Sequence, residues 1–366
     1  MVVCSILSLI CFLENAMVIF VYTKDKELRD SQGVFKLSLG FSDLIAAGII
    51  YPTFANSLSK VTMSREIMGT PYNESAVVGD KQRFDSLPRY PGGDAWSHFD
   101  QPYLDFVGFF TSLHLSVTIF TFIMASADRI LFYKRYLAYS KGNAKKFAVL
   151  TVPATWLAGV AVAIPSLFVN RYTLIASILV LSSGSTALLF YVVAFGIPII
   201  TMWILSTVTL VLNLKKARRI KSVTTGNERL MRDVLQEDRH AKTLCIMVGT
   251  FSLSLILGCI SAVAALVLGE DENGFPINEN RTSVKMSLEF VSIVFLISNS
   301  FWNFFVQFAR DSKFRKTTLG LFLCSCSETQ ISREAGMAPM DSTTTLDPVD
   351  KFSHKKMSSD LSTTQM

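Results

Sequence analysis

Apolar runs of about 20 residues alternate with polar segments along most of this chain. A helix of that length crosses the hydrocarbon core of a bilayer, which is roughly 30 Å thick. The pattern therefore predicts an integral membrane protein whose helices pack as a seven-span bundle. The predicted spans cover residues 2–22, 34–58, 104–133, 144–168, 186–214, 243–268 and 284–308.

The first apolar run begins next to the initiator methionine, where a signal peptide would also lie. It is longer than the apolar region of a signal peptide, lacks a basic leader, and is not followed by a small-residue cleavage site. We therefore interpret it as a retained first helix. Glu14 and Asn15 lie in its middle, where we expect polar groups to face other helices.

The segments between the runs differ in length and composition. Residues 59–102 form a long polar loop rich in Gly, Pro, Asp and aromatic residues, and residues 215–242 form a polar segment that favours helix. A basic amphipathic patch at residues 310–315 predicts a short eighth helix on the membrane surface. We expect residues 1–316 to form the membrane domain and residues 317–366 to form a disordered polar tail.

The distribution of charge predicts the orientation in the membrane. Lys and Arg are concentrated after the first, third, fifth and seventh runs, and such residues favour the cytosolic side. The N-terminus is then extracellular and the C-terminus cytoplasmic. Two glycosylation sequons, at Asn73 and Asn280, fall on the extracellular side in this orientation. Because the basic residues lie in short clusters beside apolar spans, nucleic-acid binding is not expected.

The six cysteines fall into two groups. Cys4, Cys11, Cys245 and Cys259 lie inside apolar runs, where a small apolar packing role is expected. None lies in the long polar loops, so a disulfide framework there is excluded. The pair Cys324 and Cys326 follows the amphipathic patch and suits S-palmitoylation, with two unmodified cytosolic thiols as the alternative.

An Asp-Arg pair, Asp128-Arg129, closes the third apolar run and is followed by a basic segment. Charges at the end of a membrane span are costly and usually have a function. Asp43 lies within the second run, and an isolated buried carboxylate must be neutralised or paired.

These polar positions, in this order, resemble the motifs of rhodopsin-like (class A) G-protein-coupled receptors. The resemblance extends from about residue 13 to residue 315. It rests on Glu14-Asn15, Leu39-Gly40-Phe41-Ser42-Asp43, Asp128-Arg129-Ile130, Trp156, Pro198, Lys242-Thr243-Leu244, Asn299-Ser300-Phe301-Trp302-Asn303 and Phe314-Arg315.

The chain also departs from the family pattern. The sixth helix has Ser254-Leu255-Ile256-Leu257 in place of the family's Cys-Trp-x-Pro. In the seventh helix, Phe304 replaces a proline and Gln307 replaces a tyrosine. Leu104 stands where a cysteine is expected, so the family's disulfide between a loop and the third helix is absent. These differences affect the expected activation mechanism more than the expected fold.

The resemblance implies a switch at the cytoplasmic side. Arg129 is expected to pair with Asp128 and with Glu237 in the resting state, and loss of this clamp would let the sixth helix move outward to admit a G protein. An ion pair near water suits a two-state element because a few kcal/mol at most separates its states. The alternative is an ordinary arginine that extends from a helix end toward the headgroups.

A second group of residues is expected in the middle of the bundle. The family holds a sodium ion with an Asp and nearby oxygens, and oxygen ligands suit such a cation. The alternative is a protonated Asp43 hydrogen-bonded to Asn303, without an ion. The residues that correspond to the family's sodium site are Asp43, Thr118, Asn299, Ser300 and Asn303.

The ligand pocket is the least defined site. Thr111 occupies the position at which amine receptors place an Asp, so that ion pair cannot form here. Asp105 lies nearly two turns further out and can meet a cationic ligand or remain solvated. Leu255 lies where the family has a pocket tryptophan. Lys285 is at the outer end of the seventh span, so retinal Schiff-base chemistry is disfavoured.

The sequence therefore predicts an all-α bundle of seven transmembrane helices with a short eighth helix. We expect a plasma-membrane receptor, not an enzyme, that couples an unidentified small-molecule or peptide ligand to heterotrimeric G proteins. An arrestin is a further expected partner through the Ser/Thr-rich tail. The alternatives are a receptor-fold protein that acts as a scaffold or heterodimer partner, and a transporter, although no inverted repeat is visible.

Overall fold

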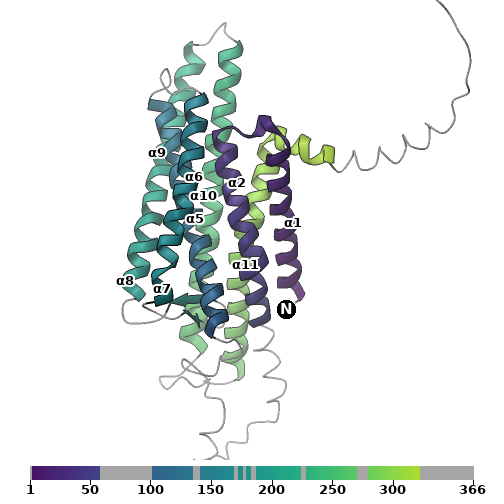
Figure 1. The fold of residues 1–366 in the computed structure, drawn as a ribbon, viewed down its shortest axis with the longest axis vertical. Helices are drawn as coiled ribbons and strands as arrows, with labels where there is room; N and C mark the ends of the chain where they lie inside the picture. Colours follow the sequence, from purple (N-terminus) through teal and green to yellow (C-terminus); the bar gives the residue numbers. More distant parts are fainter. Residues whose placement is uncertain are drawn as a thin grey trace, which may run out of the picture. The chain divides into compact units, whose positions relative to one another are not determined.

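Among the residues that the structure describes, seven helices are long and apolar enough to cross a membrane (Figure 1), which confirms the predicted bundle. The structure is a computed structural model that describes residues 2–57, 101–134, 141–168, 172–175, 179–182, 187–223, 228–269 and 279–321. The chain divides into two compact units, Met1–Gly320 and Leu321–Met366. All the helices described below lie in the first unit, apart from the last residue of the eighth helix.

The first three spans are formed as follows. Helix α1 covers Val2–Lys24 and is followed by a short 3-10 turn, η1 (Lys26–Leu28). Helix α2 (Ser31–Ile45) continues through a wider turn, η2 (Ala46–Ile50), and the second span ends at Ser57. Helix α5 covers Gln101–Lys134.

The next two spans contain the interruptions. Helix α6 (Lys141–Ala163) is followed by a single turn, α7 (Pro165–Phe168), and by a hairpin of strands β1 (Tyr172–Ile175) and β2 (Leu179–Ser182). The antiparallel register pairs Tyr172 with Ser182. Residues 169–185 lie between the fourth and fifth predicted spans, and the hairpin there was not predicted from the sequence. The fifth span consists of α8 (Ala187–Tyr191), the wider turn η4 (Val192–Gly196) and α9 (Ile197–Val223).

The last two spans are formed by two long helices. Helix α10 covers Glu228–Gly269 and α11 covers Glu279–Arg310. After Asp311, residues 312–321 are helical, so an eighth helix follows α11 as predicted. The polar segment 215–242 is largely helical as well, because α9 extends to Val223 and α10 begins at Glu228.

Two prolines explain the two wider turns. Proline has no backbone N–H, and its ring clashes with the carbonyl four residues earlier. Just before Pro52 and Pro198, the N–H groups of Tyr51 and Ile197 bond to carbonyls five residues back, at Ala46 and Val192. Each turn therefore widens where the regular ladder cannot continue.

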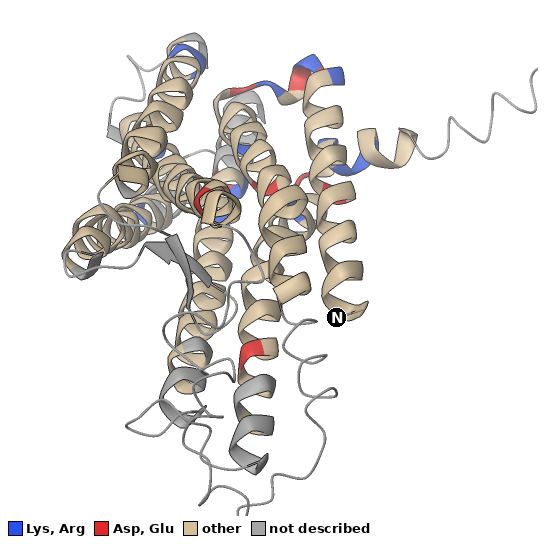
Figure 2. Ribbon diagram, turned by 60° about the horizontal axis from the view of Figure 1, so that its bottom comes forward, with Lys and Arg blue, Asp and Glu red and all other residues tan. Residues whose placement is uncertain are grey.

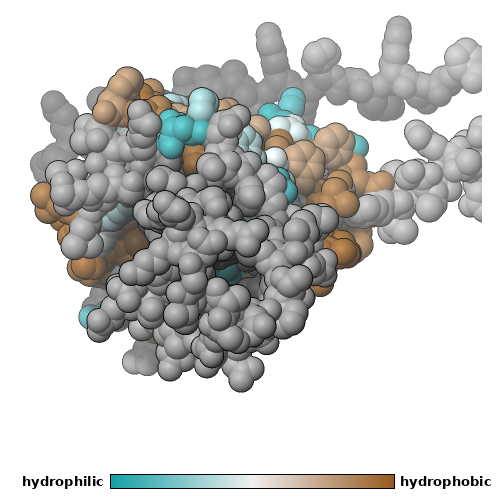
Figure 3. Space-filling view, turned by 90° about the horizontal axis from the view of Figure 1, so that it is seen from below, coloured by the Kyte–Doolittle hydropathy of each residue, from teal (hydrophilic) through white to brown (hydrophobic). Residues whose placement is uncertain are grey.

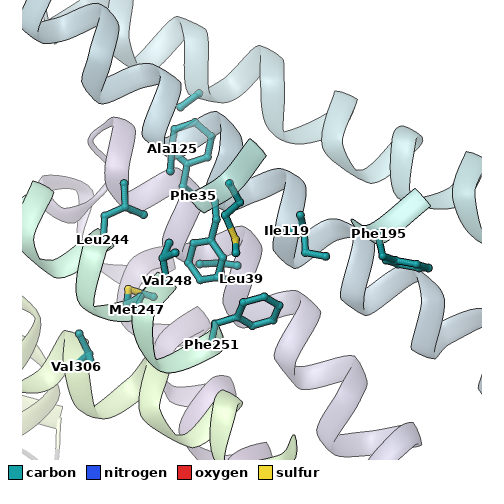
Figure 4. Close-up of a cluster of buried hydrophobic side chains, with 13 residues drawn as sticks. Phe35, Leu39, Ile119, Ala125, Phe195, Leu244, Met247, Val248, Phe251 and Val306 are labelled. Carbon is teal, nitrogen blue, oxygen red and sulfur yellow. The ribbon is translucent and has the colours of Figure 1, made fainter. Parts of the chain in front are cut away.

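A buried apolar cluster joins α2, α5, α9, α10 and α11 (Figure 4). Phe122 of α5 and Phe251 of α10 pack with their ring centroids 5.6 Å apart. Met247 of α10 and Phe35 of α2 are also fully buried here. The cluster fixes the relative positions of the helices that carry the polar residues discussed below.

The flanks of the bundle are apolar. Leu150 and Leu157 on α6 are 76% and 72% exposed, and Leu189 is 68% exposed. Figure 3 shows brown, hydrophobic side chains around the flank when the bundle is viewed from one end. A soluble monomer rarely exposes large contiguous apolar areas, so this surface is suited to lipid.

Candidate functional site

Asp128 and Arg129 lie near the C-terminal end of α5 and are both buried, with relative exposures of 0% and 3%. The Arg129 guanidinium donates to Asp128 Oδ2 through NH2 at 2.6 Å and through Nε at 3.1 Å. It also lies over the Phe132 ring, 5.4 Å from the centroid. A charge-assisted pair of this kind is stronger than a neutral hydrogen bond, so both side chains are well anchored.

A second helix contributes to the same carboxylate. Gln32 of α2 donates through Nε2 to Asp128 Oδ2 at 2.9 Å. Sequence reasoning did not identify Gln32, although its signal was present: it is a polar residue at the start of the second apolar run. Asp128 is therefore held from both α5 and α2.

The predicted third member of the switch is not described at the side-chain level. Glu237 lies on α10, but its side chain is outside the described part of the chain, so the Arg129–Glu237 contact stays a prediction. One turn further along α10, His240 Nε2 lies 3.6 Å from Asp30 Oδ2, next to the N-terminus of α2.

A chain of hydrogen bonds joins the inner ends of three helices. Tyr133 of α5 donates its hydroxyl to Asn213 Oδ1 on α9 at 2.9 Å. Asn213 Nδ2 in turn donates to Asp238 Oδ1 on α10 at 2.7 Å. Lys242 also contacts Asp238, at 2.7 Å. This series of hydrogen bonds was not predicted from the sequence, because the series depends on which faces of α5, α9 and α10 meet.

The buried carboxylate of Asp43 forms the centre of the second site. Ser300 Oγ donates to Asp43 Oδ1 at 3.0 Å, and Asn303 Nδ2 donates to Oδ2 at 2.8 Å. Tyr51 OH lies 2.6 Å from Ser300 Oγ and extends the network along α2. Three of the five predicted core residues are thus brought together between α2 and α11.

The other two predicted core residues have different surroundings. Thr118 Oγ1 lies 3.4 Å from Ser42 Oγ, which also lies 2.9 Å from His114 Nδ1. Asn299 is buried, and its side-chain oxygen has no hydrogen-bond partner among the described residues. Asn303 Oδ1 is likewise without a partner in this part of the structure.

Two comparisons place this geometry among known proteins. Residues 159–325 match the family model described as "Serpentine type 7TM GPCR chemoreceptor Srw". The crystal structure of squid rhodopsin matches with a TM-score of 0.62 and 18% identity, covering 95% of this chain and 88% of that chain. No curated protein matches.

The chain therefore has the fold of squid rhodopsin, and residues 159–325 resemble a family that is described as chemoreceptors, not as enzymes. Trp156, the landmark predicted for the fourth helix, is half-buried, and its Nε1 donates to Ser38 Oγ of α2 at 3.0 Å.

The three residues that were considered for ligand binding lie on α5 and α10. Thr111 Oγ1 donates to the Val107 carbonyl of its own helix at 2.8 Å, and Asp105 Oδ1 accepts from Gln101 at 2.8 Å. Leu255 is half-buried and packs against the apolar cluster of Figure 4. These contacts do not identify a ligand for the three residues.

The predicted modification sites lie at the margins of the described structure. Asn73, most of the loop 59–102, Cys324 and Cys326 fall outside it. Asn280 lies in the first turn of α11, of which only the backbone is described. These four positions therefore stay predictions for the receptor.

Two further functional candidates were missed by sequence reasoning. Lys36 of α2 is buried and forms an ion pair with Asp311, with 3.2 Å between Nζ and Oδ2. Burial alone raises the pKa of the Asp311 carboxyl, but Lys36 and the N–H of Phe314 stabilise the charged form, so the pKa lies below its ordinary value. A lysine inside an apolar run was the available signal.

Proposed function

We propose that this receptor lies in the plasma membrane and transmits the binding of an extracellular ligand to heterotrimeric G proteins. In this proposal the N-terminus is extracellular and the C-terminus cytoplasmic, as the distribution of Lys and Arg favours. The fold and the family match support the coarser statement that the chain is a receptor.

The observation that carries the proposal is the buried Asp128–Arg129 pair at the inner end of α5. Its charges are expensive in this position and are compensated only by specific partners. The same end of the bundle holds hydrogen bonds that cross from α5 to α9 and α10. Such interactions can exist in two arrangements, which a receptor requires to respond to a ligand.

The ligand is proposed to be an extracellular small molecule or peptide, in keeping with the word "chemoreceptor" in the matching family's description. Thr111 satisfies its hydroxyl within its own helix and carries no charge, so an amine held as in the amine receptors is disfavoured. Asp105 and Leu255 remain the candidates for contact with the ligand.

We propose that Asp43 also binds a sodium ion. The carboxylate of Asp43, the Ser300 hydroxyl and the oxygen of Asn303 are hard ligands, and Asn303 Oδ1 has no hydrogen-bond donor in the described structure. The ion would supply a positive charge that neutralises the buried carboxylate. The hydrogen bond from Asn303 to Asp43 equally suits the alternative, a protonated carboxyl without an ion.

The modifications and remaining partners are proposals of the same kind. Cys324 and Cys326 would be palmitoylated beside the eighth helix, and Asn73 and Asn280 would carry glycans. Phosphorylation of the Ser/Thr-rich tail would create the charge that an arrestin binds.

One observation favours a second function, a receptor-fold protein that serves as a scaffold or heterodimer partner. Helix α11 runs without a break across the family's usual proline position, where Phe304 packs on the Phe314 ring at 5.9 Å. Gln307, in place of the usual tyrosine, is buried and leaves Oε1 without a partner in the described residues.

Nucleotide exchange on purified G proteins tests both functions. Membranes that contain the receptor are mixed with a panel of G-protein subtypes, and membranes without it serve as the blank. We expect basal exchange above the blank for at least one subtype, and a further rise for Glu237→Gln, because this variant removes the proposed clamp. Exchange equal to the blank for every subtype, with the receptor present at the cell surface, would favour the scaffold.

A further inference from the structure

Three polar side chains at the N-terminus of α2 each contact a different part of the bundle. Asp30 lies 3.6 Å from His240 of α10, measured between Oδ2 and Nε2. Gln32 donates to Asp128 of α5. Lys36 pairs with Asp311, which separates α11 from the eighth helix. Figure 2 shows that blue and red residues gather at this end of the bundle.

The local structure aims these side chains inward. Gln32 and Lys36 are one helical turn apart and so lie on the same face of α2, where they are only 4% and 6% exposed. Asp30 is fixed separately as the N-cap, because its Oδ1 accepts from the Gly33 N–H at 2.7 Å. The local structure of α2 therefore holds all three side chains in place for contact with other helices.

The Lys36–Asp311 pair is the most restrictive of the three contacts. The two side chains are only 8% and 15% exposed, so neither charge can be fully hydrated if the pair separates in place. Asp311 Oδ1 also accepts from the backbone N–H groups of Lys313 and Phe314, which begin the eighth helix. The pair thus joins α2 to the point at which α11 turns into the eighth helix.

We infer that the N-terminus of α2 is a latch that holds the inner ends of α5, α10 and α11 in the closed arrangement. The inference rests on the proposed function, since it assigns the regulation of the same G-protein site. Outward movement of α10 would separate His240 from Asp30, and movement of α11 would separate Asp311 from Lys36. Asp30, Gln32 and Lys36 are positioning residues that act through these partners.

The latch makes α2 a partner of the Asp128–Arg129 switch. Gln32 and Arg129 donate to the same oxygen of Asp128, so the carboxylate cannot rotate toward one donor without weakening its bond to the other. Release of α2 therefore removes the bond from Gln32 that helps to position the carboxylate to which Arg129 is anchored. In this scheme the Lys36–Asp311 pair restrains the end of α11. In this helix Phe304 and Gln307 replace the family's proline and tyrosine.

The test measures the separation of the inner ends of α5 and α10 directly. Spin labels are attached there to the full-length receptor in lipid nanodiscs, and the distance distribution is measured by pulsed electron resonance. We expect Lys36→Met to raise the ratio of open to closed receptor by about tenfold, which corresponds to about 1.4 kcal/mol. The matched control is Lys313→Met, which removes an exposed pair with Glu27 close by.

Two further variants protect the test against misfolding. Gln32→Leu removes a neutral donor and leaves no new buried charge, so we expect a folded receptor with a smaller shift in the same direction. The exchanged pair Lys36→Asp with Asp311→Lys should return the distribution toward that of the wild type. Distances for Lys36→Met and Gln32→Leu that superpose on the wild type would overturn the latch.

Nucleotide exchange with the same proteins separates the two proposals. If the distances shift but no G protein is activated by any variant, the latch holds and the proposed function fails. If the wild type activates a G protein, but the α2 variants change neither the distances nor the basal exchange, the proposed function holds and the latch fails. A rise in both readouts supports the two together.

Discussion

Replacement of Gly33 by alanine gives a sharp test of how the turn η1 packs on α2. A Cβ atom at Gly33 would overlap the carbonyl oxygen of Leu28 and lie 3.2 Å from the Tyr22 ring. Ordinary contacts of this kind begin at 3.4 Å. Because the clashing atom belongs to the backbone, a change of side-chain rotamer cannot relieve the overlap. The backbones of η1 and α2 must therefore move apart.

The magnitude follows from two opposing effects. Overpacking costs about 1–3 kcal/mol, and a backbone clash lies at the upper end of that range. Alanine in place of glycine within a helix returns about 1 kcal/mol. We therefore expect Gly33→Ala to destabilise the receptor by about 2 kcal/mol. Gly249→Ala in α10 is the matched control, because a Cβ there meets nothing within 4 Å.

The assay is thermal unfolding of the purified receptor in detergent, followed by tryptophan fluorescence at a fixed scan rate. Gly33→Ala should lower the apparent midpoint by several degrees. Gly249→Ala should leave it unchanged or raise it slightly. Equal midpoints for Gly33→Ala and the wild type would show that η1 does not pack on α2 as described.

Three other predictions use the same preparation. Trp156→Phe should lower the free energy of unfolding by about 1 kcal/mol, because the bond to Ser38 is lost. Ser38→Ala should add little to this loss in the double variant, and additive losses would contradict the contact. Because the pKa of Asp311 is lowered in the folded protein, the charged carboxylate stabilises the fold at pH values above its ordinary pKa of 3.8. The loss of stability caused by Asp311→Asn should therefore be full at neutral pH and shrink as the pH falls below about 4. A loss that does not change with pH would argue against the pair. Sodium should raise the midpoint of the wild type but not of Asp43→Asn, and no difference between them would favour the protonated carboxyl.

Much of the fold could be predicted because apolar run length and charge placement are properties of the sequence alone. The spans were located to within a few residues, since a bilayer requires about 20 apolar residues for a helix. The hairpin β1–β2 was missed because its residues lie in an apolar region whose periodicity does not distinguish strand from helix. The helical extensions of α9 and α10 were only suggested by composition.

The candidate sites were predictable where a family motif carried them. Asp43, Ser300 and Asn303 meet as the resemblance implied. Gln32 and Lys36 were not assigned because their partners, Asp128 and Asp311, are 96 and 275 residues away, and only the packing of helices brings them together. Sequence spacing carries no information at that range.

The widened turns before Pro52 and Pro198 change the face of the span on which the residues across each turn lie. A turn with hydrogen bonds to the fifth residue accommodates one residue more than a regular turn, and each residue corresponds to about 100° of rotation. A helical wheel that is set on α2 or α9 and continued through η2 or η4 as if the helix were regular therefore assigns wrong faces to residues 51–57 and 187–191. Residues 187–191 should be placed on their own wheel when mutations are chosen to search for the entrance through which a ligand reaches the receptor.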